Sequence, residues 1–255
     1  MPYYQIILPI LFVLAVLVWM KESKNPWSLL GIAFIVGISI FSIFFLQSRR
    51  SETSLRVVGY ASKLFESDLV KWNVSVQKSV GTSELKRGYN DMAADIAAFK
   101  AYLIEQGIAD KDISIQPPTS YPMYDNYGNM TSYNINQSVF VLSQDLDKID
   151  KISLNAEFFA NRGMLLQNSQ LNYLYTKLPD LKKQLLAEAT ADAVARAKEI
   201  SGSAKTGLGK MREARAGVFQ ITEPYSTDVS DYGIYNTSTR QKSISVTLTA
   251  VFGLR

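Results

Sequence analysis

The sequence predicts an α+β fold, with a two-helix transmembrane hairpin over residues 1–50, a linker over 51–56 and a soluble domain over 57–255. Three patterns support this prediction. Two long uncharged apolar runs lie near the N-terminus, several later segments alternate strictly between apolar and polar residues, and one segment carries a single apolar stripe at helical spacing. Alternation indicates strands and the stripe a helix, so we expect an antiparallel sheet with helices packed on it.

The N-terminal runs are Tyr3–Met20, of 18 residues, and Trp27–Leu46, of 20 residues. As helices they would be roughly 27 and 30 Å long, close to the thickness of the hydrocarbon core of a bilayer. The connector between them is short and polar, which predicts an antiparallel hairpin with both chain ends on one side. Indoles and cationic side chains favour the membrane interface, and the predicted interface residues are Trp19, Trp27, Arg49 and Arg50.

Composition limits the chemistry that the chain can perform. It has 27 basic and 23 acidic residues, with no Cys and no His. Four of the basic residues and one acidic residue lie in the first fifty positions, so the soluble part is close to neutral and lacks the basic character typical of nucleic-acid binding. The absence of Cys and His excludes disulfides, thiolate nucleophiles and the commonest metal ligands.

The soluble domain reads as a succession of strands and helices. Leu69–Lys78 alternates most clearly, with one buried and one solvent-facing side. A helix that begins at a Thr82 or Ser83 cap and ends before Gly107 carries the apolar stripe, and two further helices are expected over Asp145–Asn161 and from Pro179 to about Ser203. The other predicted strands are 55–64, 113–116, 133–142, 165–175, 211–222 and 242–252.

The resulting order is ββα-ββα-βα-ββ, and its middle corresponds to a ferredoxin-like β-α-β-β-α-β unit. The same residues resemble a family, the SIMPL domain of bacterial envelope proteins. The most telling stretches are Ala193-Val194-Ala195-Arg196-Ala197-Lys198-Glu199 and Gly207-Leu208-Gly209-Lys210. Further matches are Val57-Val58-Gly59-Tyr60, Phe65-Glu66-Ser67-Asp68 and Leu103-Ile104-Glu105-Gln106-Gly107-Ile108.

The resemblance covers about 57–254 and rests on the ordered succession of these stretches. It implies a periplasmic or otherwise extracytoplasmic domain at the inner membrane, without established catalysis. It also implies assembly into homo-oligomers, which are ring- or channel-like in some members of the family. Other members are linked to stress tolerance. Ser67 stands where the family usually has Pro, and related proteins carry one anchor segment where this chain has two apolar runs. The flanking positive charges, in contrast, slightly favour a cytoplasmic domain.

No motif predicts a catalytic residue, a cofactor or a metal. The spacing Gly202-x-x-x-x-Gly207 lacks the Lys and Ser/Thr of a phosphate-binding loop and leaves a helix instead of entering one. The pair Ser83 and Lys86 matches Ser-x-x-Lys but lies at a helix start, where capping explains the serine. The acidic cluster Asp145, Asp147 and Asp150 fits a helix N-terminus better than a calcium loop.

Two groups of tyrosines are the candidate contact residues, because amphipathic rings suit protein interfaces. Both lie in segments rich in turn residues, so mere disorder is the alternative. The sequence therefore predicts a membrane-anchored, non-enzymatic scaffold whose partners are the lipid bilayer and copies of itself. The alternatives are an adaptor that binds another envelope protein and a Ser/Lys hydrolase. The tyrosines are Tyr121, Tyr124 and Tyr127 in one group and Tyr225, Tyr232 and Tyr235 in the other.

Overall fold

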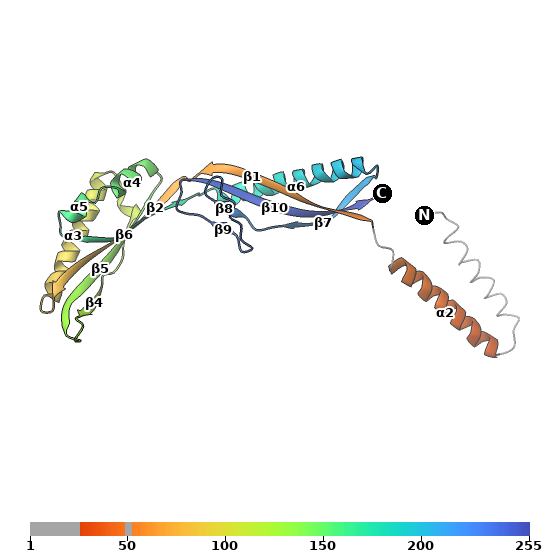
Figure 1. Cartoon of the computed structure of the whole chain (residues 1–255), viewed down its shortest axis with the longest axis horizontal. Helices are drawn as coiled ribbons and strands as arrows, with labels where there is room; N and C mark the ends of the chain where they lie inside the picture. The colour runs from red at the N-terminus through yellow and green to blue at the C-terminus, as the bar shows by residue number, and fades with distance from the viewer. Residues whose placement is uncertain (1–25, 49–52) are drawn as a thin grey trace. The chain divides into compact units, whose positions relative to one another are not determined.

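The computed structural model describes residues 26–48 and 53–255. The chain divides into two units, residues 1–54 with the last residue, and Leu55–Leu254. In the first unit, α2 spans Pro26–Ser48, and its phenylalanines Phe34, Phe41 and Phe44 are exposed. The second unit contains both sheets and all the other helices of the described chain (Figure 1).

The predicted transmembrane hairpin is corrected by the structure. Among residues 26–48 and 53–255, no helix combines the length and the apolar character that a membrane span requires. The fold class is therefore mixed α+β without that hairpin. The first predicted span, Tyr3–Met20, and the predicted interface residues Trp19, Arg49 and Arg50 lie outside the described residues, whereas Trp27 lies in the first turn of α2.

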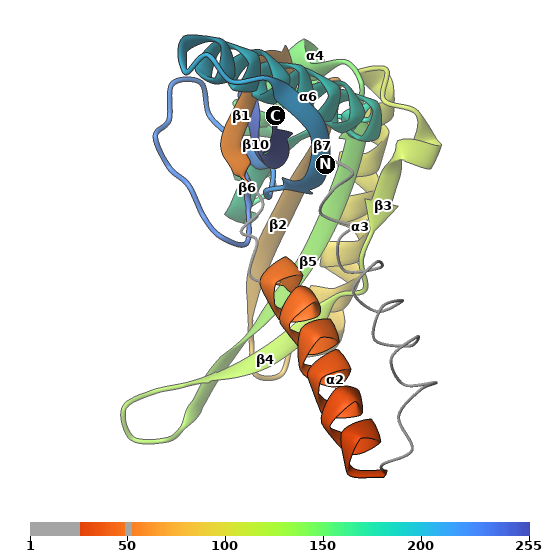
Figure 2. The same ribbon diagram turned by 90° about the vertical axis from the view of Figure 1, so that its right-hand side faces the viewer.

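One sheet is built on two long strands, β2 (Leu69–Gly81) and β5 (Met130–Ser143), which pair antiparallel along most of their lengths. The strand order is β3-β5-β2-β6, with β4 also paired to β5. The shorter strands are β3 (Ile113–Ile115), β4 (Thr119–Tyr124) and β6 (Leu165–Leu174). The β4–β5 ribbon lies at one edge of this sheet, because residues 132–136 of β5 pair with β2 as well as with β4, and its hairpin tip protrudes from the sheet (Figure 2).

Three helices cover this sheet, namely α3 (Leu85–Glu105), α4 (Leu146–Ser153) and α5 (Glu157–Ala160), and a 3₁₀ turn η1 (Asp110–Asp112) precedes β3. Alternate residues of β2, including Val70, Trp72 and Val74, are buried against α3. The alternate apolar residues of β2 lie on one face of the strand, and the apolar stripe of α3 lies on one face of the helix. These two faces pack against each other and form one core.

The second sheet has the order β1-β10-β8-β9, and β7 pairs with β10 beyond β8. The long strands are β1 (Ser54–Glu66) and β10 (Gln241–Leu254), and the others are β7 (Leu208–Ala216), β8 (Gln220–Thr222) and β9 (Ile234–Tyr235). A single 26-residue helix, α6 (Leu178–Ser203), lies along β1 and β10 and carries the alanines of the sequence into the core (Figure 1).

The expectation of one sheet is therefore wrong, because the ten strands of the described chain divide between two five-stranded sheets with separate cores. Two predicted elements are also interrupted. The helix expected over Asp145–Asn161 breaks at Leu154–Ala156, where the Asn155 side chain accepts a hydrogen bond from the Glu157 amide and starts α5. The strand expected over Met211–Thr222 divides into β7 and β8.

Candidate functional site

The first tyrosine group lies on the β4–β5 ribbon. Tyr121 is tied down, because its hydroxyl donates to Gln77 Oε1 at 3.3 Å and accepts from Asn136 Nδ2 at 3.0 Å. Tyr124 and Tyr127 extend toward the tip and are exposed, Tyr127 to 90%. Tyr121 and Tyr124 therefore lie on a paired strand, whereas Tyr127 lies in the turn at the tip.

Asp125 organises the tip of this ribbon. Its carboxylate accepts hydrogen bonds from the backbone amides of Tyr127 and Asn129, at 2.9 and 2.8 Å, and from the Asn129 side chain at 3.1 Å. These bonds, those from Asn129 foremost, hold the pKa of Asp125 below its usual value. Gly128 supplies the positive φ that the tight turn needs. The exposed Tyr127 ring is therefore held on an ordered backbone.

The second tyrosine group lies in the segment between β8 and β10. Tyr225 and Tyr232 are among the most exposed side chains of the described chain, Tyr232 to 97%, and Tyr235 lies in β9. The segment is fixed to the sheet, since the Gln220 side chain both donates to the Ser230 carbonyl at 2.7 Å and accepts from its amide at 3.3 Å. Asn236 makes a further bond to Glu223 at 2.8 Å.

The structure thus places the two tyrosine groups on different sheets and does not gather them into one cluster. Both groups are solvent-exposed on hydrogen-bonded segments, which is the condition for a contact surface that loses little entropy on binding. Disorder, the alternative left open by the sequence, does not fit these hydrogen bonds.

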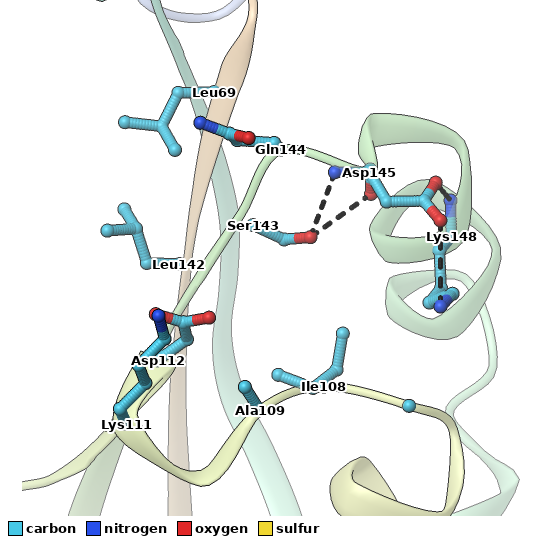
Figure 3. Close-up of a pocket in the computed structure, with 11 residues that line it drawn as sticks. Leu69, Ile108, Ala109, Lys111, Asp112, Leu142, Ser143, Gln144, Asp145 and Lys148 are labelled. Carbon is cyan, nitrogen blue, oxygen red and sulfur yellow. Dashed lines mark hydrogen bonds and ion pairs between the residues drawn. The ribbon is translucent and has the colours of Figure 1, made fainter.

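A pocket that the sequence did not reveal lies beside the start of α4 (Figure 3). It encloses about 370 Å³ and is lined from three separate segments, around Leu69, over 107–112 and over 142–148. Its charged side chains are Lys111, Asp112, Asp145 and Lys148, so the lining is close to neutral. No sequence signal could have found it, since the three segments meet only through the pairing of β5 with both β2 and β3.

The chemistry of this pocket is restricted by its own hydrogen bonds. The Ser143 hydroxyl accepts from the Asp145 amide at 3.0 Å, and the Lys148 ammonium lies 3.6 Å from the Asp145 carboxylate (Figure 3). A Ser–Lys nucleophile would need the serine and the lysine to engage each other. Here Ser143 and Lys148 each contact Asp145 instead, so these contacts do not form a Ser–Lys pair.

The residues weighed for chemistry in the sequence have structural places. Asp145 is the N-cap of α4 and accepts from the Lys148 amide at 3.1 Å, as predicted for an acidic helix start. Ser83 does not cap α3, whose N-cap residue is Glu84 and whose first turn has no side-chain capping bond. Gly202 lies inside α6, and Lys205, with a φ of 54°, takes a left-handed conformation just after the helix. Within the described residues, no three acidic side chains gather as metal ligands would.

A cluster around Arg240 joins the two sheets, and sequence reasoning missed it because its members are far apart in the chain. The Arg240 guanidinium contacts Glu66 at 2.6 Å, at the end of β1, and Asp147 at 2.5 Å, on α4. Asp150, 4.0 Å from Arg240, accepts a hydrogen bond of 2.6 Å from the Tyr173 hydroxyl. Burial and this bond raise the pKa of Tyr173 to about 12, and pairing with Arg240 lowers the pKa of Asp147.

The second sheet contains an unusual buried cation. Lys242 is 1% exposed on the core face of β10, and its ammonium donates to the backbone carbonyl of Thr239. Burial lowers the pKa of this lysine to about 8. Its burial and its bond to the Thr239 carbonyl place this ammonium in the core of the second sheet.

These observations define an α+β protein of two helix-covered sheets that presents ordered, exposed surfaces and shows no assembled nucleophile in its described pockets. Residues 55–252 match the family model of SIMPL, a protein family of unknown function (DUF541). The chain belongs to the SIMPL family, and the resemblance drawn from the sequence is confirmed. A search of curated proteins finds no match to this chain.

Proposed function

We propose that this SIMPL-family chain is a non-enzymatic protein of the bacterial cell envelope that assembles with copies of itself into a scaffold. The observation that carries the proposal is the pair of exposed tyrosine groups on hydrogen-bonded segments, with Tyr127 and Tyr232 exposed to 90% and 97%. Exposed aromatic rings on rigid backbone have a large apolar area to bury and little entropy to lose, which is the usual character of an interface.

The mass of the full chain in solution tests this proposal directly. Light scattering at micromolar concentration should give a mass of two or more chains. The double variant Tyr127→Ser and Tyr232→Ser should weaken the assembly without unfolding the chain, because neither ring is buried. Leu154→Ser is the matched control, since Leu154 is also an exposed apolar residue but belongs to neither tyrosine group. A monomeric wild-type chain at these concentrations would contradict the proposal.

The second candidate function is an adaptor that uses the same tyrosine surfaces to bind another envelope protein. The observation in its favour is the placement of the two tyrosine groups on different sheets, which would allow two different partners. Purification from native envelopes separates the candidates. A stoichiometric foreign subunit that the two Tyr→Ser changes remove would favour the adaptor, whereas a homo-oligomer alone favours the scaffold.

The location outside the cytoplasm is part of the proposal and has its own test. A reporter fused after Arg255 that is active only outside the cytoplasm should give a signal in growing cells, as the family resemblance implies. The complementary reporter, active only in the cytoplasm, should be silent. The reverse pair of results would agree with the slight charge bias of the N-terminal region and would remove the envelope from the proposed function.

A further inference from the structure

The edge strands of the two sheets in the second unit differ in whether their outward backbone amides already have a hydrogen-bond partner. On β1, the Tyr60 amide donates to Asp192 of α6 at 2.8 Å, and on β6 the Tyr173 amide donates to the Thr237 carbonyl at 2.7 Å. On β4, Pro122 has no amide hydrogen to offer. In contrast, β7 pairs only with β10 among the described strands, and its nine residues contain no proline.

The hydrogen-bonding direction of each β7 residue follows from its register. The Gly217 amide donates to the Thr247 carbonyl at 2.8 Å, so Gly217 faces β10. In an antiparallel pair this direction alternates along the strand, so Arg215 and Glu213 also face β10, opposite Thr249 and Val251. The amide and carbonyl groups of Ala214 and Ala216 therefore point away from the sheet, on an exposed stretch of strand.

The side chains of this stretch favour one way of pairing β7 with a second copy of itself. Glu213 and Arg215 lie two residues apart on one face and contact each other at 2.5 Å within the chain. If two antiparallel β7 strands cross at Ala214, each Glu213 lies opposite the other copy's Arg215 on both sides of the twofold axis. A crossing at Glu213 or at Arg215 would place identical charges directly opposite, which is destabilising.

The crossing at Ala214 also satisfies the backbone. Ala214 of the two copies would form a hydrogen-bonded pair, with Cα atoms about 5.5 Å apart, because its amide and carbonyl point outward. The neighbouring pairs, which join residues 213 and 215, would be of the closer, non-hydrogen-bonded kind, with Cα atoms about 4.5 Å apart. The small side chains of Ala214 and Ala216 leave room for the approach, and this edge would join two five-stranded sheets into one.

We propose that β7 is a homodimer interface, in which two copies of the chain pair antiparallel about a twofold axis at Ala214, with Glu213 of each copy facing Arg215 of the other. The inference rests on the proposed function and deepens it, because it names one contact by which copies assemble. The partner is fixed by self-complementary charge and by an edge whose outward groups form the required pattern.

Charge reversal tests the register without changing the backbone. E213R and R215E should each weaken self-association at least about tenfold, since each turns two cross-strand attractions into repulsions. Mixed together, the two variants should form a heterodimer, because an attractive pair is then restored on both sides of the axis. The pair within each chain stays repulsive, so recovery in the mixture reports the contact between chains. E105R, an exposed change on α3, is the control and should leave association unchanged.

Cysteine cross-linking tests the position of the axis, and the full chain contains no cysteine to interfere. A214C should form a disulfide dimer on mild oxidation, because about 5.5 Å between Cα atoms lies within disulfide range. A216C should not, because residue 216 lies opposite residue 212 of the other copy. If the wild-type chain is an oligomer but A214C does not cross-link and the mixed variants do not recover, the β7 interface is wrong while the scaffold stands. If the wild-type chain is a monomer, both fail.

Discussion

The two sheets of the SIMPL domain are covered by helices in opposite ways. The sheet built on β2 and β5 meets its helices through large side chains, with Trp72, Phe99 and Phe159 packed ring against ring at centroid distances of 4.9 to 5.9 Å. The sheet built on β1 and β10 meets the middle of α6 through alanines and a glycine, Ala189, Ala193 and Gly59. The comparison teaches that the first core depends on large side chains that fill the space between sheet and helices. The second depends on small residues that let α6 approach the sheet closely.

Removing volume from the aromatic core should have the largest effect. Phe99→Ala should lower the free energy of unfolding by about 3–5 kcal/mol, since the ring is buried and contacts Trp72, Phe158 and Phe159. Denaturant unfolding measures the change. Phe140→Ala is the control, because Phe140 is only partly buried on the outer face of β5 and should cost clearly less. Equal losses would mean that the ring cluster has no special place in the core.

Adding volume should damage the alanine core instead. In Gly59→Ala the new Cβ would lie 2.1 Å from the Ala189 carbonyl oxygen and 2.7 Å from the Ala193 amide nitrogen, both backbone atoms. The helix would have to move, at a cost of about 1–3 kcal/mol or more. Gly81→Ala is the matched control, because its Cβ would meet only the Glu84 side chain at ordinary contact distance. A neutral Gly59→Ala would show that α6 can lift off the sheet freely.

Lys242, which is buried in the second sheet, should make the stability of the domain depend on pH. The folded state lowers the pKa of Lys242 from 10.5 to about 8. The cost of burying its charge is therefore fully present below pH 8. Between pH 8 and 10.5 the unfolded chain binds more protons, so this cost shrinks as the pH rises. Lys242→Met should therefore stabilise the domain at pH 7 by about 1–3 kcal/mol, less the lost bond to Thr239.

Unfolding curves of the wild type and of Lys242→Met at pH 7 and pH 10 measure this cost, and the gain should be smaller at pH 10. Lys63→Met on β1 is the control, since that lysine is exposed and bonded only to Gln184 among the described residues. A gain that did not change with pH would mean that better packing, and not the removed charge, stabilises the variant.

The sequence predicted the separate elements of the domain better than their assembly. Strict alternation over Leu69–Lys78 and the stripe of α3 come from local spacing, and α6 was found from Pro179 to Ser203. Which strand pairs with which is not local, so one sheet was expected where β10 and β2 each organise their own. The interruption at Leu154–Ala156 was missed because Asn155 was counted as a helix residue, although its side chain starts a new helix.

The candidate site divides in the same way. The tyrosines were predicted from local composition, and the structure shows them exposed, but their ordered backbone depends on bonds such as those of Gln220 to Ser230. The pocket beside α4 and the Arg240 cluster could not be predicted, since residues 66, 147 and 240 meet only after both sheets have formed. The open edge of β7 likewise depends on knowing that β10 is its partner.

The smallest expected effect concerns the junction between the two cores. Tyr173→Phe removes the hydrogen bond to Asp150 but leaves the ion pairs of Arg240 with Glu66 and Asp147. We expect a loss of about 1 kcal/mol at pH 7. Since the folded pKa of Tyr173 is raised from 10.0 to about 12, wild-type stability should fall as the pH rises from 10 to 12, and the variant should lack this component.

Hydrogen exchange then tests whether the Arg240 cluster couples the unfolding of the two cores. If Tyr173 helps them to unfold as one unit, Tyr173→Phe should lower the protection of β6 and α4 more than that of β10, although both sheets remain folded. Tyr175→Phe is the matched control, because the Tyr175 ring packs at a tilt against Phe65, with centroids 4.9 Å apart, and keeps that contact without its hydroxyl. Equal loss of protection across β6, α4 and β10 would mean that the cores are coupled through the backbone bonds of Ser67 and Asp68, and not through this tyrosine.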